Sequence, residues 1–289
     1  MKKKSLSINM FMIDGTIDSA IKCTESNWTG IVLRVPRQKL DEYRNRPEMK
    51  QSSIYLLFGT NEKTQEPTIY IGQASERALG TGPYQRFQEH NKSEGKTFWD
   101  DTIIITTRDN SLGATELCFL ENHFYKAALK AARFSLANNV EPKRGRISEE
   151  KESEMLDFAE HVNVLVGLLG YKAFEPLISE DMRNDEDIFK LSVFEAQAKM
   201  KRTDEGFVVL SGSKIRNSLV KSCPGSVKRS RKLYSAAIDT ATGTLKKDLL
   251  FKSPSGASSF VIGRSSNGWI EWKNDKNKSL KEVLKQENE

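Results

Sequence analysis

The chain has 289 residues, of which 37% are hydrophobic and 29% are charged, and its formal net charge is +6. These values are typical of a globular chain of about two domains, and no apolar run approaches the roughly 18 residues that a membrane-spanning helix needs. The three cysteines lie far apart without a Cys-x-x-Cys pair, and no long apolar stretch follows the basic first residues. We therefore expect no disulfide framework, zinc site, signal peptide or membrane partner, and a cytoplasmic location.

Residues 1–50 are predicted to be a lead-in that packs on an edge of the domain that follows. Within it, residues 28–35 are β-branched and bounded by Gly30 and Pro36, which favours a strand. Residues 38–46 favour a short helix that the next proline stops. No chemistry is assigned to this part of the chain.

Residues 51–178 are predicted to form the first domain. Residues 53–59 and 68–73 favour two short strands joined by a polar loop, and residues 102–107 favour a third strand because they are strongly β-branched. The predicted helices are a first one from Pro83 to about residue 90, a long one over 112–134 capped by Asn110 and Ser111, and an acidic-start one over 148–169.

Tyr55 and Tyr70 lie on the two strands that the hairpin would place side by side, so their hydroxyl groups can converge on one face. A tyrosine has an ordinary pKa of about 10, and it becomes a base near neutral pH only when a nearby cation lowers that pKa. Two core tyrosines that merely pack the hairpin are the alternative interpretation.

Arg86 and His90 are four residues apart, so they share one face of the predicted helix. Arginine binds phosphate through two parallel hydrogen bonds, and histidine transfers protons near neutral pH. The alternative is an exposed surface pair without a chemical role.

Glu121 lies within the apolar face of the predicted long helix. That face consists of Leu117, Leu120, Phe124 and Ala128. A carboxylate in such a place must be paired or metal-bound, because an unpaired buried charge is unfavourable by several kcal/mol. One carboxylate suits Mg²⁺, which keeps water molecules and takes phosphate oxygens as further ligands. A salt bridge to Arg86 or Arg133 is the alternative.

The order of these residues resembles the GIY-YIG nuclease family. The resemblance rests on Ser53-Ile54-Tyr55, Tyr70-Ile71-Gly72, Arg86 with His90, Glu121 and Asn138, and it covers about residues 52–139. The chain departs from the family at Ser53, where the motif usually has glycine. A small residue there is compatible with activity.

The resemblance implies an α+β fold, in which a small antiparallel three-stranded sheet is flanked by helices. It implies a catalytic set of Tyr55, Tyr70, Arg86, His90 and Asn138, and a divalent metal, Mg²⁺ or Mn²⁺, on Glu121. The expected function is metal-dependent endonuclease cleavage of DNA. Which tyrosine is the base, and whether the protein is a monomer that nicks or a homodimer that cuts both strands, stay open.

Residues 179–200 are predicted to be a linker region, and residues 201–289 a small, basic α+β domain. This last segment holds 18 Lys and Arg against 9 Asp and Glu, whereas residues 1–200 hold 27 against 30. Residues 214–232 contain seven basic residues and no acidic one, which favours a polyanionic partner such as DNA. The candidate DNA-binding residues are Lys214, Arg216, Lys228, Arg229, Arg231 and Lys232.

The tail is expected to contain strands at 206–212 and 268–273 and a short helix from Ser253-Pro254 to Gly263. It is similar to a domain of unknown function that often follows GIY-YIG modules. Trp269 and Trp272 would lie on nearly opposite strand faces, so one is expected in the core and the other is free to stack on a base.

The main interpretation is therefore a DNA endonuclease with a DNA-holding tail. A non-catalytic nucleic-acid-binding protein on a GIY-YIG scaffold is the alternative, although a decayed site would be free to lose Glu121 or Arg86. A structural protein without a nucleic-acid partner is disfavoured by the positive charge of the tail.

Overall fold

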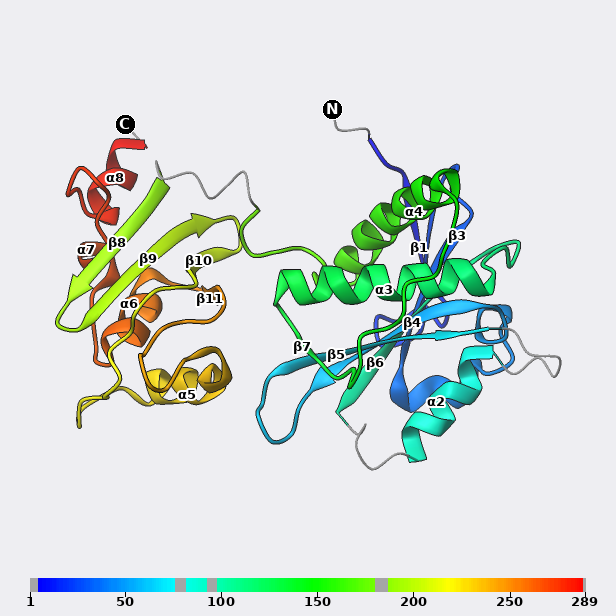
Figure 1. The fold of residues 1–289 in the computed structure, drawn as a ribbon, viewed down its shortest axis with the longest axis horizontal. Helices are drawn as coiled ribbons and strands as arrows, with labels where there is room; N and C mark the ends of the chain where they lie inside the picture. The colour runs from blue at the N-terminus through cyan, green and yellow to red at the C-terminus, as the bar shows by residue number, and fades with distance from the viewer. Residues whose placement is uncertain (1–4, 76–81, 93–97, 180–186, 288–289) are drawn as a thin grey trace. The chain divides into compact units, whose positions relative to one another are not determined.

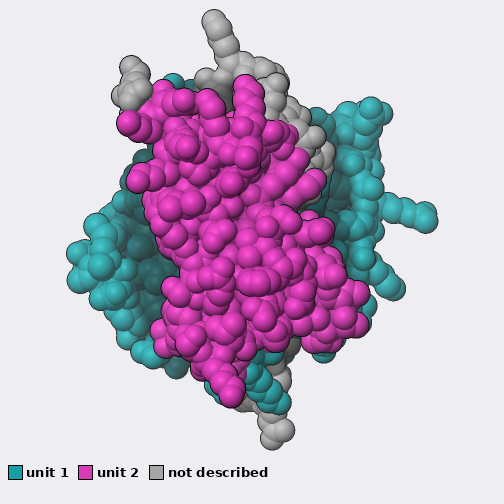
Figure 2. All heavy atoms as spheres, turned by 90° about the vertical axis from the view of Figure 1, so that its left-hand side faces the viewer, with its two compact units in different colours: residues 1–175 teal, residues 176–289 magenta. Residues whose placement is uncertain are grey.

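The computed structural model describes residues 5–75, 82–92, 98–179 and 187–287 (Figure 1). The chain divides into two compact units, Met1–Glu175 and Pro176–Glu289, which are coloured separately in Figure 2. Each unit has its own sheet and its own apolar core. Among the described residues, no helix is both long enough and apolar enough to cross a membrane.

A seven-stranded sheet forms the first unit, in the order β1-β2-β3-β6-β4-β5-β7. Its strands are β1 (Ile8–Met12), β2 (Ile21–Glu25), β3 (Gly30–Pro36), β4 (Ser53–Thr60), β5 (Pro67–Ala74), β6 (Trp99–Thr107) and β7 (Ser135–Leu136). All neighbouring strands are antiparallel except β5 and β7, which are parallel.

The expected three-stranded sheet is thus wrong in size. The three predicted strands are β4, β5 and β6, but β3 pairs with β6 along its whole length, from Gly30 opposite Thr107 to Pro36 opposite Asp101. The physical reason lies in β6, whose isoleucines 103–105 are fully buried on both faces, so its second edge also needs a strand partner. The first 36 residues supply that partner and two further strands.

Helices cover both faces of this sheet (Figure 1). They are α1 (Leu40–Tyr43), α2 (Gly82–Lys92), α3 (Ala114–Ala131) and α4 (Glu149–Leu168), with short 3-10 turns at Arg37–Lys39 and Pro47–Met49. Alternate residues of β4 separate the two sides: Ile54 and Leu56 pack with α3 and α4, whereas Tyr55 packs with Phe87 of α2. The unit therefore has three layers.

Of the caps predicted for the two longer helices, the structure contains the one on α4 but not the one on α3. Ser148 caps α4, and its hydroxyl accepts a hydrogen bond from the Lys151 amide. Asn110 and Ser111 do not cap α3, which begins after Gly113 without a side-chain cap. Asn110 has a left-handed backbone with φ of 53° and accepts a hydrogen bond from the Ser52 amide instead, so it fastens the start of β4.

The second unit has a four-stranded antiparallel sheet in the order β11-β10-β9-β8. Its elements are β8 (Ile188–Val193), β9 (Ala196–Thr203), β10 (Gly206–Val209), α5 (Gly225–Leu233), a 3-10 turn (Ser235–Ala237), β11 (Leu249–Phe251), α6 (Pro254–Ile262), α7 (Gly268–Glu271) and α8 (Leu280–Glu287). The buried helix α6 has the predicted ends, a Ser253 side-chain cap and Gly263 in the left-handed region.

Two expectations for this unit differ from the structure. Most of the expected linker is ordered sheet, because residues 188–200 form β8 and most of β9 with alternating buried side chains; residues 180–186 lie outside the described residues. The expected strand at 268–273 is largely the helix α7, which the Asn267 side chain caps. Trp272 is buried and its Nε1 donates to the Pro254 carbonyl, whereas Trp269 is 41% exposed.

Candidate active site

The hairpin of β4 and β5 brings the two tyrosines together. Tyr55 lies opposite Gly72 and Tyr70 lies opposite Leu57, so the tyrosines are diagonal neighbours on the face that α2 covers. Their ring centroids are 6.1 Å apart. Alternation of side chains along the strands predicts this contact, and the register of the hairpin supplies it.

His90 comes to the same place from α2. Its Nε2 lies 2.9 Å from the Tyr55 hydroxyl, and its ring centroid lies 5.0 Å from that of Tyr70. His90 and Tyr55 are both buried, so the Tyr55 hydroxyl and the imidazole form a hydrogen-bonded pair with little exposure to bulk solvent. Such a pair can pass a proton in one step.

Gly72 leaves room for the Tyr55 ring. A Cβ atom at position 72 would lie 2.4 Å from Cζ and 2.5 Å from the hydroxyl oxygen of Tyr55. No side chain fits there without moving the ring. The glycine of the Tyr70-Ile71-Gly72 motif therefore has a direct steric role, which is to let Tyr55 lie across β5 beside Tyr70.

Arg86 lies one helical turn before His90 on α2. Its Nη1 is 2.8 Å from a carboxylate oxygen of Glu89, and its side chain is 42% exposed. The hydrogen bond to Glu89 raises the pKa of Arg86, so the guanidinium stays charged. Because an exposed pair of this kind contributes little stability, an incoming phosphate can replace Glu89.

Glu121 comes from α3, on the opposite face of the sheet. It is half-buried, and its Oε2 accepts a hydrogen bond of 2.9 Å from Gln73 of β5. Burial raises the pKa of the carboxyl group, and the Gln73 hydrogen bond opposes that rise. In the described part of the chain no ion pair joins Glu121 to Arg86 or Arg133, so neither expected salt bridge is present.

Tyr70 and Gln73, which binds Glu121, both lie on β5 near one edge of the sheet. The strand β7 pairs only with Thr68 and Ile69, so within the described residues no strand covers this edge beyond Ile69. The Glu121 carboxylate is close enough to raise the pKa of Tyr70 and, more weakly, of Tyr55. For both tyrosines burial is the largest cause of the raised pKa, so both hydroxyl groups are protonated near neutral pH.

Asn138 holds this edge in place. Its Oδ1 accepts from the Ile71 amide at 3.0 Å and its Nδ2 donates to the Ile71 carbonyl at 2.7 Å. The side-chain amide therefore imitates the next rung of a strand ladder, one residue from Tyr70 and one from Gly72. This geometry makes Asn138 a positioning residue, although the resemblance grouped it with the catalytic ones.

Sequence reasoning missed Gln73. Its Nε2 donates to Glu121, and the same nitrogen lies 3.3 Å from the Cys118 sulfur. The available signal was alternation, since Gln73 follows Ile69 and Ile71 on the face of β5 that meets α3. A polar residue that ends such an apolar series is a candidate partner for the one carboxylate on the facing helix.

The predicted DNA-binding residues of the second unit fall into two groups, four exposed residues and two half-buried arginines. Lys214, Lys228, Arg229 and Lys232 are exposed, and the last three lie on α5. Arg216 is half-buried, with its guanidinium 5.3 Å from the Phe194 ring centroid. Arg231 is different, because its guanidinium donates to the carbonyls of Phe260, Arg216 and Val261. Burial lowers the pKa of Arg231 to about 10. It joins α5 to α6 and does not offer its charge to a ligand.

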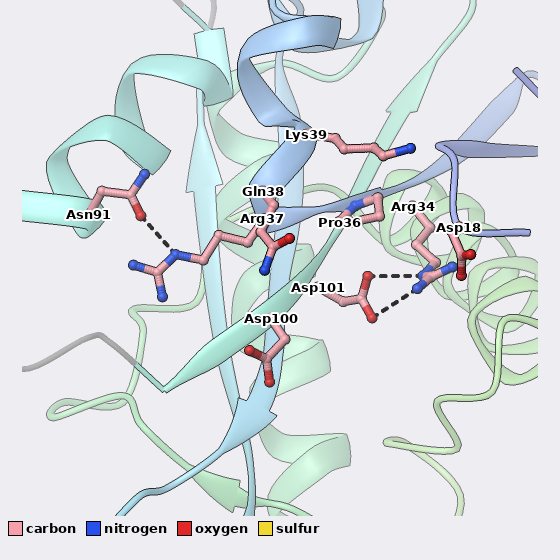
Figure 3. Close-up of a pocket in the computed structure, with 9 residues that line it drawn as sticks. All are labelled: Asp18, Arg34, Pro36, Arg37, Gln38, Lys39, Asn91, Asp100 and Asp101. Carbon is pink, nitrogen blue, oxygen red and sulfur yellow. Dashed lines mark hydrogen bonds and ion pairs between the residues drawn. The ribbon is translucent and has the colours of Figure 1, made fainter. Parts of the chain in front are cut away.

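A polar cavity of about 700 Å³ lies elsewhere in the first unit (Figure 3). The ends of β3 and α2 and the start of β6 enclose it, and neither Tyr55 nor Glu121 lines it. Arg34 is bound by both carboxylate oxygens of Asp101, and Arg37 lies over the Trp99 ring and donates to Asn91. These contacts join the end of β3 to the start of β6, and the lining residues do not include the tyrosine cluster.

Comparison with known proteins finds one family. Residues 189–284 match the model of a domain of unknown function, DUF4357, a range that runs from β8 into α8. No GIY-YIG family model matches the first unit. No curated protein and no solved structure matches the chain. The second unit is thus similar to a known domain of unassigned activity.

Proposed function

We propose that the protein is a metal-dependent endonuclease that hydrolyses DNA phosphodiester bonds at the open end of β5. The observation that carries the proposal is the cluster of Tyr55, Tyr70 and His90, joined by the Tyr55–His90 hydrogen bond and by ring contacts. Arg86 lies on the same helix as His90, and Glu121 is bound by Gln73 of the strand that carries Tyr70. These residues come from β4, β5, α2 and α3, and their side-chain types match the needs of phosphoryl chemistry.

The donor set fits a magnesium-type ion and not a zinc-type one. Among the described residues there is no group of three or more His, Cys, Asp and Glu that could hold a metal, which zinc would need. Glu121 offers one half-buried carboxylate that has no basic partner in the described part of the chain, and Mg²⁺ or Mn²⁺ fits such a site with water and phosphate oxygens as further ligands. When bound, the ion supplies positive charge against the charge that develops on the phosphate.

Arg86 is the residue that binds and orients the phosphate. Its guanidinium is exposed and permanently charged, and it exchanges the Glu89 carboxylate for two phosphate oxygens. Gln73 holds the carboxylate of Glu121 toward the same place. The phosphate is thereby placed between groups from α2 and α3, beside the hydroxyl groups of the tyrosines.

Tyr55 is the better placed of the two tyrosines to act as the base. Because burial raises its pKa, a free phenolate is unfavourable, and the proton must leave as the new one arrives. The Tyr55 oxygen takes a proton from the attacking water while its own proton passes to His90 Nε2, 2.9 Å away. The water oxygen bonds to phosphorus, the bond to the leaving oxygen breaks, and that oxygen is protonated from solvent.

The second candidate function is binding of nucleic acid without cleavage. It is favoured by the exposed Lys228, Arg229 and Lys232 on α5, which do not depend on the tyrosine cluster. In that case the first unit has the fold of a nuclease but does not cleave nucleic acid.

Cleavage of supercoiled plasmid separates the two functions. Wild-type protein is incubated with Mg²⁺, with Mn²⁺ and with a chelator, beside Glu121→Gln and Arg86→Gln. We expect metal-dependent nicking or linearisation that each substitution slows by at least about 100-fold, since each removes charge that stabilises the transition state. Cutting that survives either substitution would refute the site, and binding without cutting under every metal would favour the second function.

Glu116→Gln and Arg44→Gln are the matched controls. Glu116 lies on the same helix as Glu121 but outside its apolar stripe, and Arg44 is an exposed arginine that follows α1. Both variants should cut like the wild type. A contaminating nuclease would cut equally in all five preparations.

A further inference from the structure

Phe194 occupies an unfavourable position at the tip of the β8–β9 hairpin. It is 72% exposed, and its backbone is in the left-handed region with φ of 53°. Val193 pairs with Ala196, so Phe194 and Glu195 form a two-residue turn, where glycine or asparagine is the usual choice. A phenylalanine there exposes an aromatic ring and strains the backbone, and neither effect helps the fold.

Two arginines from distant parts of the second unit lie against this ring. The guanidinium carbons of Arg216 and Arg264 are 5.3 Å and 5.9 Å from the ring centroid. Arg264 directly follows the Gly263 cap of α6, and the Arg216 backbone amide donates to the Val261 carbonyl of the same helix. The end of α6 therefore fixes both arginines beside the hairpin tip.

Part of each arginine side chain lacks a hydrogen-bond partner among the described residues. The Nε atoms of Arg216 and Arg264 are both buried, and neither has a hydrogen-bond partner among the described residues. Arg264 otherwise makes one long bond of 3.5 Å, from Nη1 to the Ser265 carbonyl. The described residues form no ion pair with either arginine, and the nearest acid in sequence to the ring, Glu195, is exposed. Buried donors without acceptors call for a further acceptor, and beside two guanidinium groups an anion suits that place.

Helix α5 is tied to the segment that carries Arg216. Arg231 of α5 donates to the Arg216 carbonyl and to the Val261 carbonyl. Lys228, Arg229 and Lys232 are exposed on the same helix. The second unit therefore offers further positive charge to an anionic ligand.

We propose that Phe194, Arg216 and Arg264 form a site for an unpaired nucleobase and its phosphate, so that the second unit binds single-stranded nucleic acid. The ring stacks on a base, and the terminal nitrogens of the two guanidinium groups bind the phosphate. Bases inside a duplex are stacked on one another and cannot reach a ring at a hairpin tip. The site goes beyond the proposed cleavage, because it lies in the second unit and needs no metal.

Fluorescence anisotropy with the full chain and a chelator tests this site without cleavage. The probes are a labelled 12-nucleotide strand, a blunt duplex of the same sequence and an abasic strand of equal length. Phe194→Asn should weaken binding of the strand by about tenfold, as the loss of one stacked base predicts, and leave the duplex and abasic strand within about twofold. Arg216→Gln and Arg264→Gln should weaken binding of both single strands.

The choice of asparagine separates binding from folding. Asparagine suits a left-handed turn, so Phe194→Asn should melt at or above the temperature of the wild type while it loses binding. Phe194→Tyr should keep both properties. The control is Arg202→Gln, an exposed arginine that pairs with Glu287.

Three results would overturn the proposal. The first is wild-type protein that does not bind the single strand, and the second is Phe194→Asn that binds it like the wild type. The third is competition by an acidic peptide that equals competition by the unlabelled strand, since that would assign the arginines to a protein partner. Success or failure here is independent of plasmid cutting, so the two proposals can fail separately.

Discussion

The two units treat their polar and charged side chains in opposite ways. In the first unit the reactive groups are wholly or partly buried and most are fixed by a named partner: Tyr55 by His90, Glu121 by Gln73. In the second unit the cations of α5 are exposed, and the Phe194 ring projects into solvent. Fixed and desolvated groups suit chemistry, whereas exposed and adjustable ones suit binding of a long anion. The two proposals accordingly put cutting in the first unit and holding in the second.

The largest expected effect comes from filling the space beside Tyr55. Gly72→Ala places a methyl group within 2.4 Å of the ring, so the ring or β5 must move. We expect cleavage to fall by at least about 100-fold, because a displacement near 1 Å in a catalytic group has an effect of that order. Binding of single strands by the second unit should be unchanged, and both are measured on one preparation.

Gly167→Ala is the matched control for this change. Gly167 lies in α4, and a methyl group there meets only a Glu175 oxygen at 3.9 Å. That variant should cut normally and be slightly more stable, because alanine favours a helix. Normal cleavage by Gly72→Ala would mean that Tyr55 does not need its present position.

The next largest effect separates the two kinds of basic residue on α5. Arg231→Gln leaves the carbonyls of Phe260 and Arg216 without this donor, whereas the Val261 carbonyl keeps the Arg216 amide, so the free energy of unfolding should fall by about 2–3 kcal/mol. Lys232→Gln should leave stability unchanged and lower the slope of log affinity against log salt by about one. Unfolding in denaturant measures the stability of each variant, and binding titrations at several salt concentrations measure the slope. Equal free energies of unfolding for Arg231→Gln and Lys232→Gln would contradict the division into structural and exposed basic residues.

The sequence predicts the local parts of this fold and site better than the distant ones. The ends of α6 follow from Ser253 and Gly263, and the meeting of Tyr55 with Tyr70 follows from alternation along a hairpin. The pairing of β3 with β6 joins residues about 70 positions apart, and no local pattern encodes it. The sequence also gives no sign that Arg231 is half-buried, because its neighbours Lys228, Arg229 and Lys232 are basic as well and are exposed.

Helix α7 shows a different kind of failure. Residues 268–273 alternate apolar and polar side chains as a strand does, but Gly268 lies against the Pro254 carbonyl, where a Cβ atom would be only 2.0 Å away. Asn267 then caps the turn and Trp272 fills the core. Tertiary packing therefore overrides the local pattern. The expectation that one tryptophan is buried and the other exposed agrees with the structure.

The smallest expected effect concerns the pH dependence of stability. Burial raises the pKa of Glu121, so its ionised form destabilises the folded state once the pH exceeds the unfolded value of about 4.3. Without metal, Glu121→Gln should therefore melt above the wild type at pH 7.5, by on the order of 1–2 °C, with the difference shrinking as the pH falls toward 4. Added Mg²⁺ should raise the melting temperature of the wild type and leave that of Glu121→Gln unchanged.

A difference that is the same at pH 4 and pH 7.5 would contradict this account of Glu121. Glu116→Gln is again the control, and its melting temperature should not respond to Mg²⁺ differently from that of the wild type.

The central claim is that the residues at the end of β5 act as one catalytic site. The most direct measurement is single-turnover cleavage of a labelled duplex by Arg86→Gln, Glu121→Gln and the double variant. Groups that act as a unit are not additive, so the double variant should cut no more than about threefold slower than the slower single variant. The claim would be contradicted if the fold-loss in cleavage rate of the double variant equalled the product of the fold-losses of the two single variants.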